Sequence, residues 1–231
     1  MKKFHILIAL IPFLLYASPN EELIKHVKNG KLEEVKKILK TYKNPNATGM
    51  KQKTAIMYAL EKDEVEIAKL LLNSGANITA EDDTGTTVLM YASKNGHAGI
   101  VQMITEKKTD VNLKNKLGKT ALIYACENGY TDVVKVLIAA KANVNKSAND
   151  GKTPLIYAST IGNLDIIKLL LEAGANINAR NKKGVTAYNV ASNIGRPETA
   201  EYLLEHGAIK EDLPPPSFWP IGLTGQKRHK K

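Results

Sequence analysis

Cysteine and large aromatic residues are scarce in this 231-residue chain. It holds one cysteine, one tryptophan and three phenylalanines, and aromatic residues make up 6% of the whole. A single cysteine excludes an internal disulfide, so the chain is not a small secreted domain that depends on crosslinks. Beyond residue 17, no apolar run reaches the roughly 20 residues that a membrane-spanning helix needs. Apolar and charged contents of 43% and 24% are ordinary, which excludes a disordered chain.

The positive charge is concentrated at the two ends of the chain. Of the formal net charge of +10, Lys2 and Lys3 contribute two, and four basic residues over 227–231 contribute four more. A protein that binds nucleic acid along its folded surface would carry this excess as a continuous stripe. Nucleic acid is therefore not an expected partner of the chain between these ends.

Residues 1–17 are predicted to be an export signal. Lys2 and Lys3 precede an apolar run over 4–16, and Ala17 offers the small residue at which a signal peptidase cuts. We expect cleavage after Ala17, with an uncleaved anchor as the alternative. Export of a chain without disulfides favours a bacterial periplasm, and a location outside the cell stays open.

A repeat of 33 residues organises most of the chain. Three residue types recur at this step: Thr54, Thr87, Thr120, Thr153 and Thr186; Ala59, Ala92, Ala125, Ala158 and Ala191; and Gly30, Gly96, Gly129, Gly162 and Gly195, with Asp63 in the missing glycine position. A period of this length is typical of stacked repeats. We expect six units, at about 20–48, 49–81, 82–114, 115–147, 148–180 and 181–213, within one domain over 18–213.

The unit over 148–180 shows why each recurrent residue is needed. Thr153 can cap a helix over 154–161, and Pro154 fits the first helical position because no amide donor is needed there. Gly162 can adopt the left-handed backbone that reverses the chain. A second helix follows with apolar residues at three- and four-residue spacing, and Gly174 ends it. Two short helices leave one apolar side open, so the units must stack.

The period and the order of these segments resemble the ankyrin-repeat family. The segment from Thr153 to Ala158 reads Thr-Pro-Leu-Ile-Tyr-Ala and is similar to the family's Thr-Pro-Leu-His-x-Ala motif. The segment over 169–178 is similar to the ending of the family's second helix. The resemblance covers about residues 20–210 and implies an all-α solenoid of about six helix-turn-helix units with short β-turn loops, a protein partner, no cofactor and no catalytic chemistry.

The chain departs from the family pattern at two kinds of position. The motif histidine is absent, and Met57, Met90, Ile123, Ile156 and Asn189 take its place. We expect apolar packing to replace its hydrogen bond in the first four of these units. Lys108 and Lys141 stand where Gly75, Gly174 and Gly207 end the second helix in other units, and a left-handed backbone there costs each lysine about 1 kcal/mol.

The family's usual binding positions are the turn tips and the concave surface of the inner helices. Carried over by position, they predict a mildly basic face that fits a protein partner with an acidic surface. The candidate residues are Lys51, Lys53, Lys62, Asp83, Thr84, Lys94, Asn95, Lys116, Leu117, Lys119, Glu127, Asn128, Asp150, Lys152, Thr160, Ile161, Lys182, Lys183, Asn193 and Ile194. These positions vary between units while the frame does not, which is typical of a binding face on a constant scaffold.

Tyr58, Tyr91, Tyr124 and Tyr157 follow the same 33-residue step and should form a row on the inner helices. They either pack between units with their hydroxyl groups held at the edge, or form part of an amphipathic binding strip.

No residue cluster predicts catalysis or metal binding. The histidines are scattered among units, and we expect His26 and His97 to be solvated at the surface. Cys126 takes a position that serine fills in several units, so it is predicted to be a small packed residue.

The segment over 214–231 is predicted to be a proline-rich, basic tail. Phe218 and Trp219 follow three prolines and either cover the last unit or form a docking motif. The leading hypothesis is a monomeric, non-enzymatic scaffold for another protein, in the periplasm or outside the cell. The alternatives are a host-directed effector or toxin component, and a binder of anionic surfaces or nucleic acid through the tail.

Overall fold

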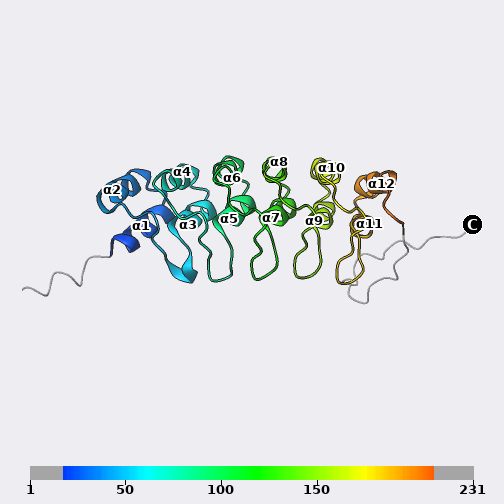
Figure 1. Cartoon of the computed structure of the whole chain (residues 1–231), viewed down its shortest axis with the longest axis horizontal. Coiled ribbons are helices and arrows are strands. Elements are labelled where there is room, and N and C mark those ends of the chain that lie inside the picture. The colour runs from blue at the N-terminus through cyan, green and yellow to red at the C-terminus, as the bar shows by residue number, and fades with distance from the viewer. Residues whose placement is uncertain (1–17, 211–231) are drawn as a thin grey trace, which may run out of the picture.

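The computed structural model describes residues 18–210, which form one row of stacked helix pairs (Figure 1). The predicted export signal over 1–17 and the predicted tail over 214–231, with Phe218 and Trp219, lie outside the described residues. Within residues 18–210 no helix is both long enough and apolar enough to cross a membrane.

Twelve α-helices form six consecutive pairs within the described range, as the 33-residue period predicts. They are α1 (Pro19–Lys28), α2 (Leu32–Tyr42), α3 (Ala55–Glu61), α4 (Val65–Asn73), α5 (Val88–Lys94), α6 (Ala98–Thr105), α7 (Ala121–Asn128), α8 (Thr131–Ala139), α9 (Pro154–Ile161), α10 (Leu164–Glu172), α11 (Ala187–Asn193) and α12 (Pro197–Glu205). A 3-10 turn, η2 (Met50–Gln52), precedes α3.

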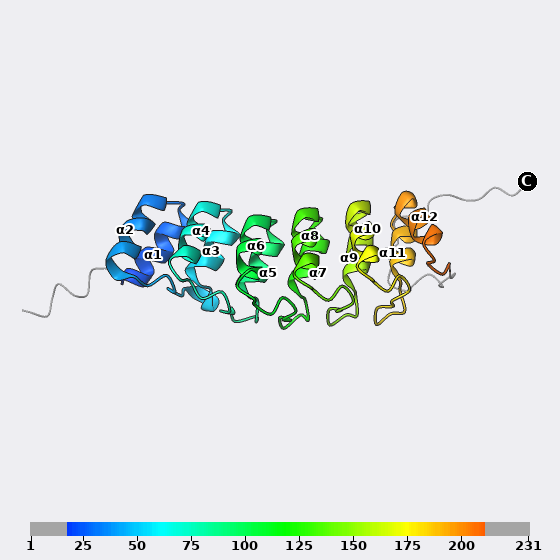
Figure 2. The ribbon, with the colours of Figure 1, turned by 45° about the horizontal axis from the view of Figure 1, so that its top comes forward.

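The helices lie in two layers, with a series of loops projecting from one side (Figures 1 and 2). The odd-numbered helices form the layer next to the loops and are called the inner helices here. The even-numbered helices form the outer layer. The loops that enter α3, α5, α7, α9 and α11 are called fingers. They leave the stack in the same direction, so they place equivalent residues of successive units side by side.

Threonine caps start the inner helices where the sequence predicts them. In four units the threonine hydroxyl accepts a hydrogen bond from the backbone N–H three residues later, and these bonds are 3.2–3.4 Å long at Thr87, Thr120, Thr153 and Thr186. At Thr54 the hydroxyl is buried without a partner in the described range, and the Thr54 amide donates to the Met57 sulfur at 3.4 Å instead.

The position of the family's histidine is apolar and buried in four units, as expected. Met57, Met90, Ile123 and Ile156 are each at most 1% exposed. In the sixth unit the amide side chain of Asn189 restores a polar link, because its oxygen accepts from the backbone N–H and the hydroxyl of Thr186 at 3.0 and 2.8 Å. Apolar packing therefore replaces the hydrogen bond of the family's histidine in four units but not in the last one.

The chain reversals between inner and outer helices are covered by residues of the next unit. A side-chain carbon added at Gly96 would lie 2.8 Å from the ring of Tyr130, so this contact requires glycine. Asp63 takes the left-handed conformation in the second unit, with a φ of 63°, as predicted. His97 lies over it, with its Nδ1 atom 3.6 Å from the Asp63 carboxylate.

The expectation that His97 is solvated was wrong. The residue is only 8% exposed, and its Nε2 atom lies 3.1 Å from the carbonyl oxygen of Leu60 in the preceding unit. Stacking buries the ring and gives both ring nitrogens a polar neighbour. His97 is therefore a structural link between the second and third units.

Asparagines join the units on the side of the outer helices. The Asn145 side chain accepts from the Asn176 amide at 2.7 Å and donates to the Gly174 carbonyl at 3.0 Å. Asn112 and Asn178 accept in the same way from the backbone one unit later, at 2.8 and 2.9 Å. These bonds satisfy the backbone of the turns and fix the spacing of the stack.

Candidate protein-binding surface

The predicted binding residues lie along one face of the row, on the fingers and at the ends of the inner helices. Most of their side chains are exposed, and the apolar ones include Leu117 at 60% and Ile161 at 42%. Backbone hydrogen bonds of 2.9–3.0 Å join each finger tip to the next, as from Lys116 N–H to the Thr84 carbonyl and from Asn149 N–H to the Leu117 carbonyl. The tips therefore form one continuous edge.

The four tyrosines of the 33-residue row pack between the units. Tyr58, Tyr91, Tyr124 and Tyr157 are 6–8% exposed, which confirms the packing interpretation of this row. Lysine ammonium groups lie near their rings. Lys53 is 5.7 and 5.3 Å from the ring centres of Tyr58 and Tyr91. At these distances a cation is attracted to the face of an aromatic ring.

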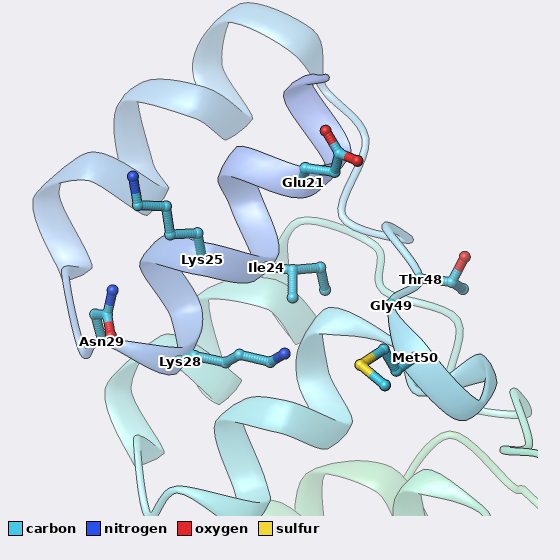
Figure 3. Close-up of a pocket in the computed structure, with 8 residues that line it drawn as sticks. All are labelled: Glu21, Ile24, Lys25, Lys28, Asn29, Thr48, Gly49 and Met50. Atoms are coloured by element: carbon cyan, nitrogen blue, oxygen red, sulfur yellow. The ribbon is translucent and has the colours of Figure 1, made fainter. Parts of the chain in front are cut away.

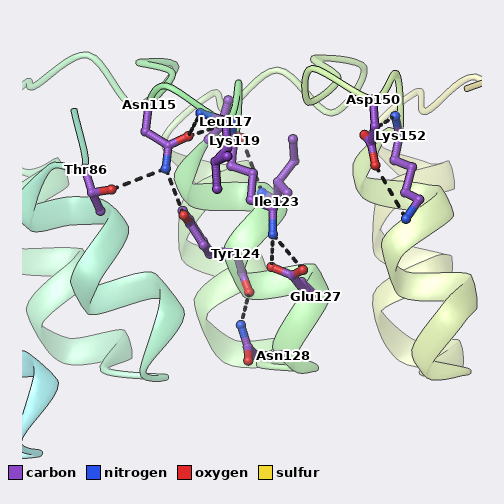
Figure 4. Close-up of polar contacts among 11 residues, drawn as sticks. Thr86, Asn115, Leu117, Lys119, Ile123, Tyr124, Glu127, Asn128, Asp150 and Lys152 are labelled. Carbon is purple, nitrogen blue, oxygen red and sulfur yellow. Dashed lines mark hydrogen bonds and ion pairs between the residues drawn. The ribbon is translucent and has the colours of Figure 1, made fainter. Parts of the chain in front are cut away.

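The tyrosine hydroxyl groups differ from unit to unit. Tyr58 donates to the Met50 carbonyl at 3.0 Å and Tyr91 donates to the Asp82 carboxylate at 2.8 Å. The hydroxyl of Tyr124 accepts from the side chain of Asn115 at 2.8 Å (Figure 4). The hydroxyl of Tyr157 has no hydrogen-bond partner within the described range.

Lys53 and Lys119 form ion pairs with carboxylates of their own inner helices. The Lys119 ammonium lies 2.6 Å from the carboxylate of Glu127 (Figure 4), and that of Lys53 lies 2.7 Å from the carboxylate of Glu61. The two lysine side chains are only 17% and 16% exposed. Their charges are thus neutralised within the chain, which favours a structural role for both.

The third and fifth units lack this internal ion pair. In the third unit Thr86 takes the place of the lysine, and Lys94 takes the place of the glutamate and is exposed. In the fifth unit Lys152 is retained, but Thr160 stands where the glutamate would be. Among the described residues, the carboxylate that pairs with the Lys152 ammonium is that of Asp150, at 3.5 Å (Figure 4). Lys94 therefore forms no ion pair within the described range, and the ion pair of Lys152 is longer than those of Lys53 and Lys119.

Side chains at the finger bases hold three of the tips in shape. Asp82 accepts from the backbone N–H groups of Thr84 and Thr86 at 2.8 and 2.9 Å, and also from the Tyr91 hydroxyl. Asn115 and Asn181 make the equivalent pair of backbone bonds in the fourth and sixth units. Ala148 replaces them in the fifth unit. That finger therefore has no side-chain anchor at this position.

Asp82 and Tyr157 are among the groups on this face whose pKa values are shifted. Burial by itself would raise the pKa of Asp82, but hydrogen bonds from Thr84, Thr86 and Tyr91 outweigh it and lower that pKa. Burial, together with the carboxylates of Asp150 and Glu127, raises the pKa of Tyr157 to about 12. Asp82 is therefore ionised and Tyr157 keeps its proton at neutral pH.

The sequence did not predict a pocket at the N-terminal end of the row. It has a volume of about 550 Å³ and lies between α1 and the first finger (Figure 3). Its lining is mixed in character and consists of Glu21, Ile24, Lys25, Lys28, Asn29, Thr48, Gly49 and Met50. Met50 is 78% exposed. The sequence carries no signal for this pocket, because neither α1 of the degenerate first unit nor the finger before α3 matches its equivalents in the other units.

Residues 18–210 contain no group of three or more histidine, cysteine, aspartate or glutamate side chains placed to hold a metal ion. Cys126 is fully buried, as predicted, and burial raises the pKa of its thiol. A thiol in that state is a weak nucleophile.

The chain belongs to the ankyrin-repeat family. A family model for ankyrin repeats in three copies matches residues 23–115, 100–181 and 142–213, which together span most of the chain. Ankyrin repeats are in general modules that bind other proteins, and the family is in general a non-enzymatic scaffold.

A solved structure with the same architecture supports this assignment. It is a crystal structure of an ankyrin repeat domain from Acinetobacter baumannii AYE, to which the chain is 33% identical, with a TM-score of 0.72. The similarity covers 81% of this chain and 98% of the other. No curated protein matches the sequence.

Proposed function

We propose that this chain is an exported, non-enzymatic scaffold that holds a partner protein on its fingers and inner helices, in the periplasm or outside the cell. The observation that carries this proposal is the contrast between the frame and the exposed face. Threonine caps and tyrosines repeat in nearly every unit, whereas the finger tips and inner-helix ends change in charge and polarity. The exposed Leu117 and Ile161 give this face apolar contact area beside its charges.

Site-specific photo-crosslinking in the cells that make the protein tests this surface. A photoreactive residue replaces Leu117 or Ile161 on the proposed face, or Gln102 on the outer helix α6 as the control. We expect Leu117 and Ile161 to capture the same protein and Gln102 to capture none. Capture of a partner from Gln102 alone would place binding on the outer layer and refute the proposed surface.

Charge reversal of lysines gives a second, quantitative test with the purified partner. The variant Lys94→Glu/Lys152→Glu/Lys182→Glu alters the proposed face. The control Lys40→Glu/Lys107→Glu/Lys135→Glu makes the same charge change on the outer helices and their ends. We expect only the first variant to slow association, because complementary charges act mainly on the association rate. Equal effects would mean that overall charge, rather than this face, attracts the partner.

Export is a separate part of the proposal. It is supported by the basic start, the apolar run over 4–16 and the small residue at Ala17. Cell fractionation with N-terminal sequencing should find a mature chain that begins at Ser18 outside the cytoplasm. Recovery of an intact chain from the cytoplasm would refute export and leave the binding surface unaffected.

A further inference from the structure

The fifth unit keeps both the tyrosine and the lysine of the fourth unit but lacks the glutamate and the finger-base side chain that these two residues contact there. The second and fourth units each contain a lysine, a glutamate eight residues later and a tyrosine whose hydroxyl is hydrogen-bonded. The fifth unit has Thr160 in place of the glutamate and Ala148 in place of the finger anchor. The first substitution leaves Lys152 without a carboxylate from its own helix, and the second leaves the Tyr157 hydroxyl without the finger-base side chain that the equivalent tyrosines contact in the third and fourth units.

Two hydrogen-bond donors of the fifth unit can take a further acceptor. The Lys152 ammonium lies 5.4 Å from the centre of the Tyr157 ring and 3.5 Å from the Asp150 carboxylate. That ion pair is longer than the 2.6–2.7 Å pairs of the second and fourth units, so the ammonium can take another acceptor. The Tyr157 hydroxyl has no partner in the described range, and it is not among the buried unpaired atoms, so it reaches solvent.

We propose that Lys152 and the Tyr157 hydroxyl bind a carboxylate from an aspartate or glutamate side chain of the partner protein. The carboxylate would pair with Lys152 as Glu61 and Glu127 pair with Lys53 and Lys119 in their own units, and it would also accept from the Tyr157 hydroxyl. This inference rests on the proposed function and names the chemistry that its surface recognises.

The surroundings favour a singly charged carboxylate on a protein over a phosphate group. Glu127 and Asp150 lie near the same tyrosine and repel a doubly charged anion more strongly than a singly charged one. Two exposed apolar residues belong to the same region. Ile161 follows Tyr157 by one helical turn, and the backbone carbonyl of Leu117 accepts from the Asn149 amide in the finger of the fifth unit. The site therefore fits an acidic residue with an apolar neighbour.

A titration of the isotope-labelled protein with defined peptides tests the site without the natural partner. The probe is the blocked peptide acetyl-Leu-Glu-Leu-amide, and the matched peptide with glutamine in place of glutamate is the control. We expect saturable amide shifts around Lys152 and Tyr157 for the glutamate peptide, with a dissociation constant of roughly 1 mM for so small a ligand. The absence of binding, equal binding of the glutamine peptide, or stronger shifts with inorganic phosphate would overturn the proposal.

Variants show whether these donors hold the carboxylate. Lys152→Met and Thr160→Glu should each weaken binding of the glutamate peptide about tenfold. The first removes the ammonium, and the second supplies an internal carboxylate that occupies it. Thr160→Gln has the same length without the charge, so its loss should be clearly smaller. Gln102→Glu adds a negative charge on the outer layer and should leave binding unchanged. Equal losses for Thr160→Glu and Gln102→Glu would mean a long-range charge effect and would overturn the assignment.

The result is separable from the test of the proposed function. If the photo-crosslinked partner binds Thr160→Glu as tightly as the natural chain, the carboxylate site is refuted and the binding surface stands. If the peptide binds at the fifth unit but no partner is captured from Leu117 or Ile161, the site stands and the proposed surface for the partner is refuted.

Discussion

Lys141 ends the outer helix α8 in a conformation that glycine adopts at the equivalent positions. Its φ is 65°, and Gly174, one unit later, has a φ of 84°. The Lys141 and Ala142 amides donate to the carbonyls of Ile138 and Leu137, both at 2.9 Å. The lysine side chain is exposed and makes no ion pair within the described range. Lys141→Gly therefore removes backbone strain without removing a contact.

The size of the gain is a difference between two opposing terms. A left-handed backbone costs an L-residue about 1–2 kcal/mol. Glycine also makes the unfolded chain more flexible, which lowers the free energy of unfolding by about 0.4–1 kcal/mol. We expect Lys141→Gly to raise the free energy of unfolding by about 0.5–1 kcal/mol, which corresponds to an increase of about 1–4 °C in Tm for a domain of this size.

Urea unfolding monitored by circular dichroism is the appropriate measurement. The slope of the unfolding free energy against urea concentration should be compared between variants. Repeat arrays can unfold in parts, so an unchanged slope is needed before the midpoints are compared. Gly174→Lys is the matched control and should lower stability by a similar amount, since nothing lies within 4 Å of an added side-chain carbon there. A loss of stability in Lys141→Gly, with Gly174→Lys neutral, would refute the argument from backbone strain.

Three further predictions concern the joints between units and the buried polar groups. Asn145→Ala removes two bonds to the next unit and should lower the free energy of unfolding by about 1–2 kcal/mol in urea. Ser159→Ala removes a buried hydroxyl that has no partner in the described range, so it should be neutral or stabilising by up to about 1 kcal/mol in the same assay. Because the folded-state pKa of Asp82 lies below its unfolded value of about 3.9, its ionised form stabilises the fold above that pH, and this contribution is lost as the pH falls through the folded-state pKa. Acid unfolding of Tyr91→Phe should show a smaller loss over that range, since one of the bonds to the carboxylate is missing.

The fold could be predicted because each unit contains the residues that determine where its helices begin and end. The helix predicted over 154–161 is α9, with Thr153 as its cap and Gly162 in the left-handed region. The positive φ values of Asp63, Lys108 and Lys141 follow from the positions of glycine elsewhere in the repeat. These features depend on residues within one unit, where propensity and capping act.

The burial of His97 could not be predicted, because it arises between units. Lys31, Glu64, Tyr130, Asn163 and Arg196 occupy the same position in other units, and none of them suggests a buried ring. The partners of His97 are a carbonyl and a carboxylate more than 30 residues earlier in the chain. His97 is of a residue type that is common at protein surfaces, but folding places its ring in a buried environment.

The candidate surface shows the same division between what lies within a unit and what depends on the folded row. Position alone placed Lys53, Lys119 and Lys152 together as equivalent basic residues of the fingers. Folding brings a glutamate eight residues later onto the first two lysines, whereas the third has a threonine at the equivalent position and a longer ion pair with Asp150. Charge counted along the sequence therefore overstates the charge that a partner meets. Lys152 lacks a glutamate partner on its own helix because Thr160 departs from the pattern of the second and fourth units. The proposed recognition therefore depends on the positions that differ between units as well as on those that repeat.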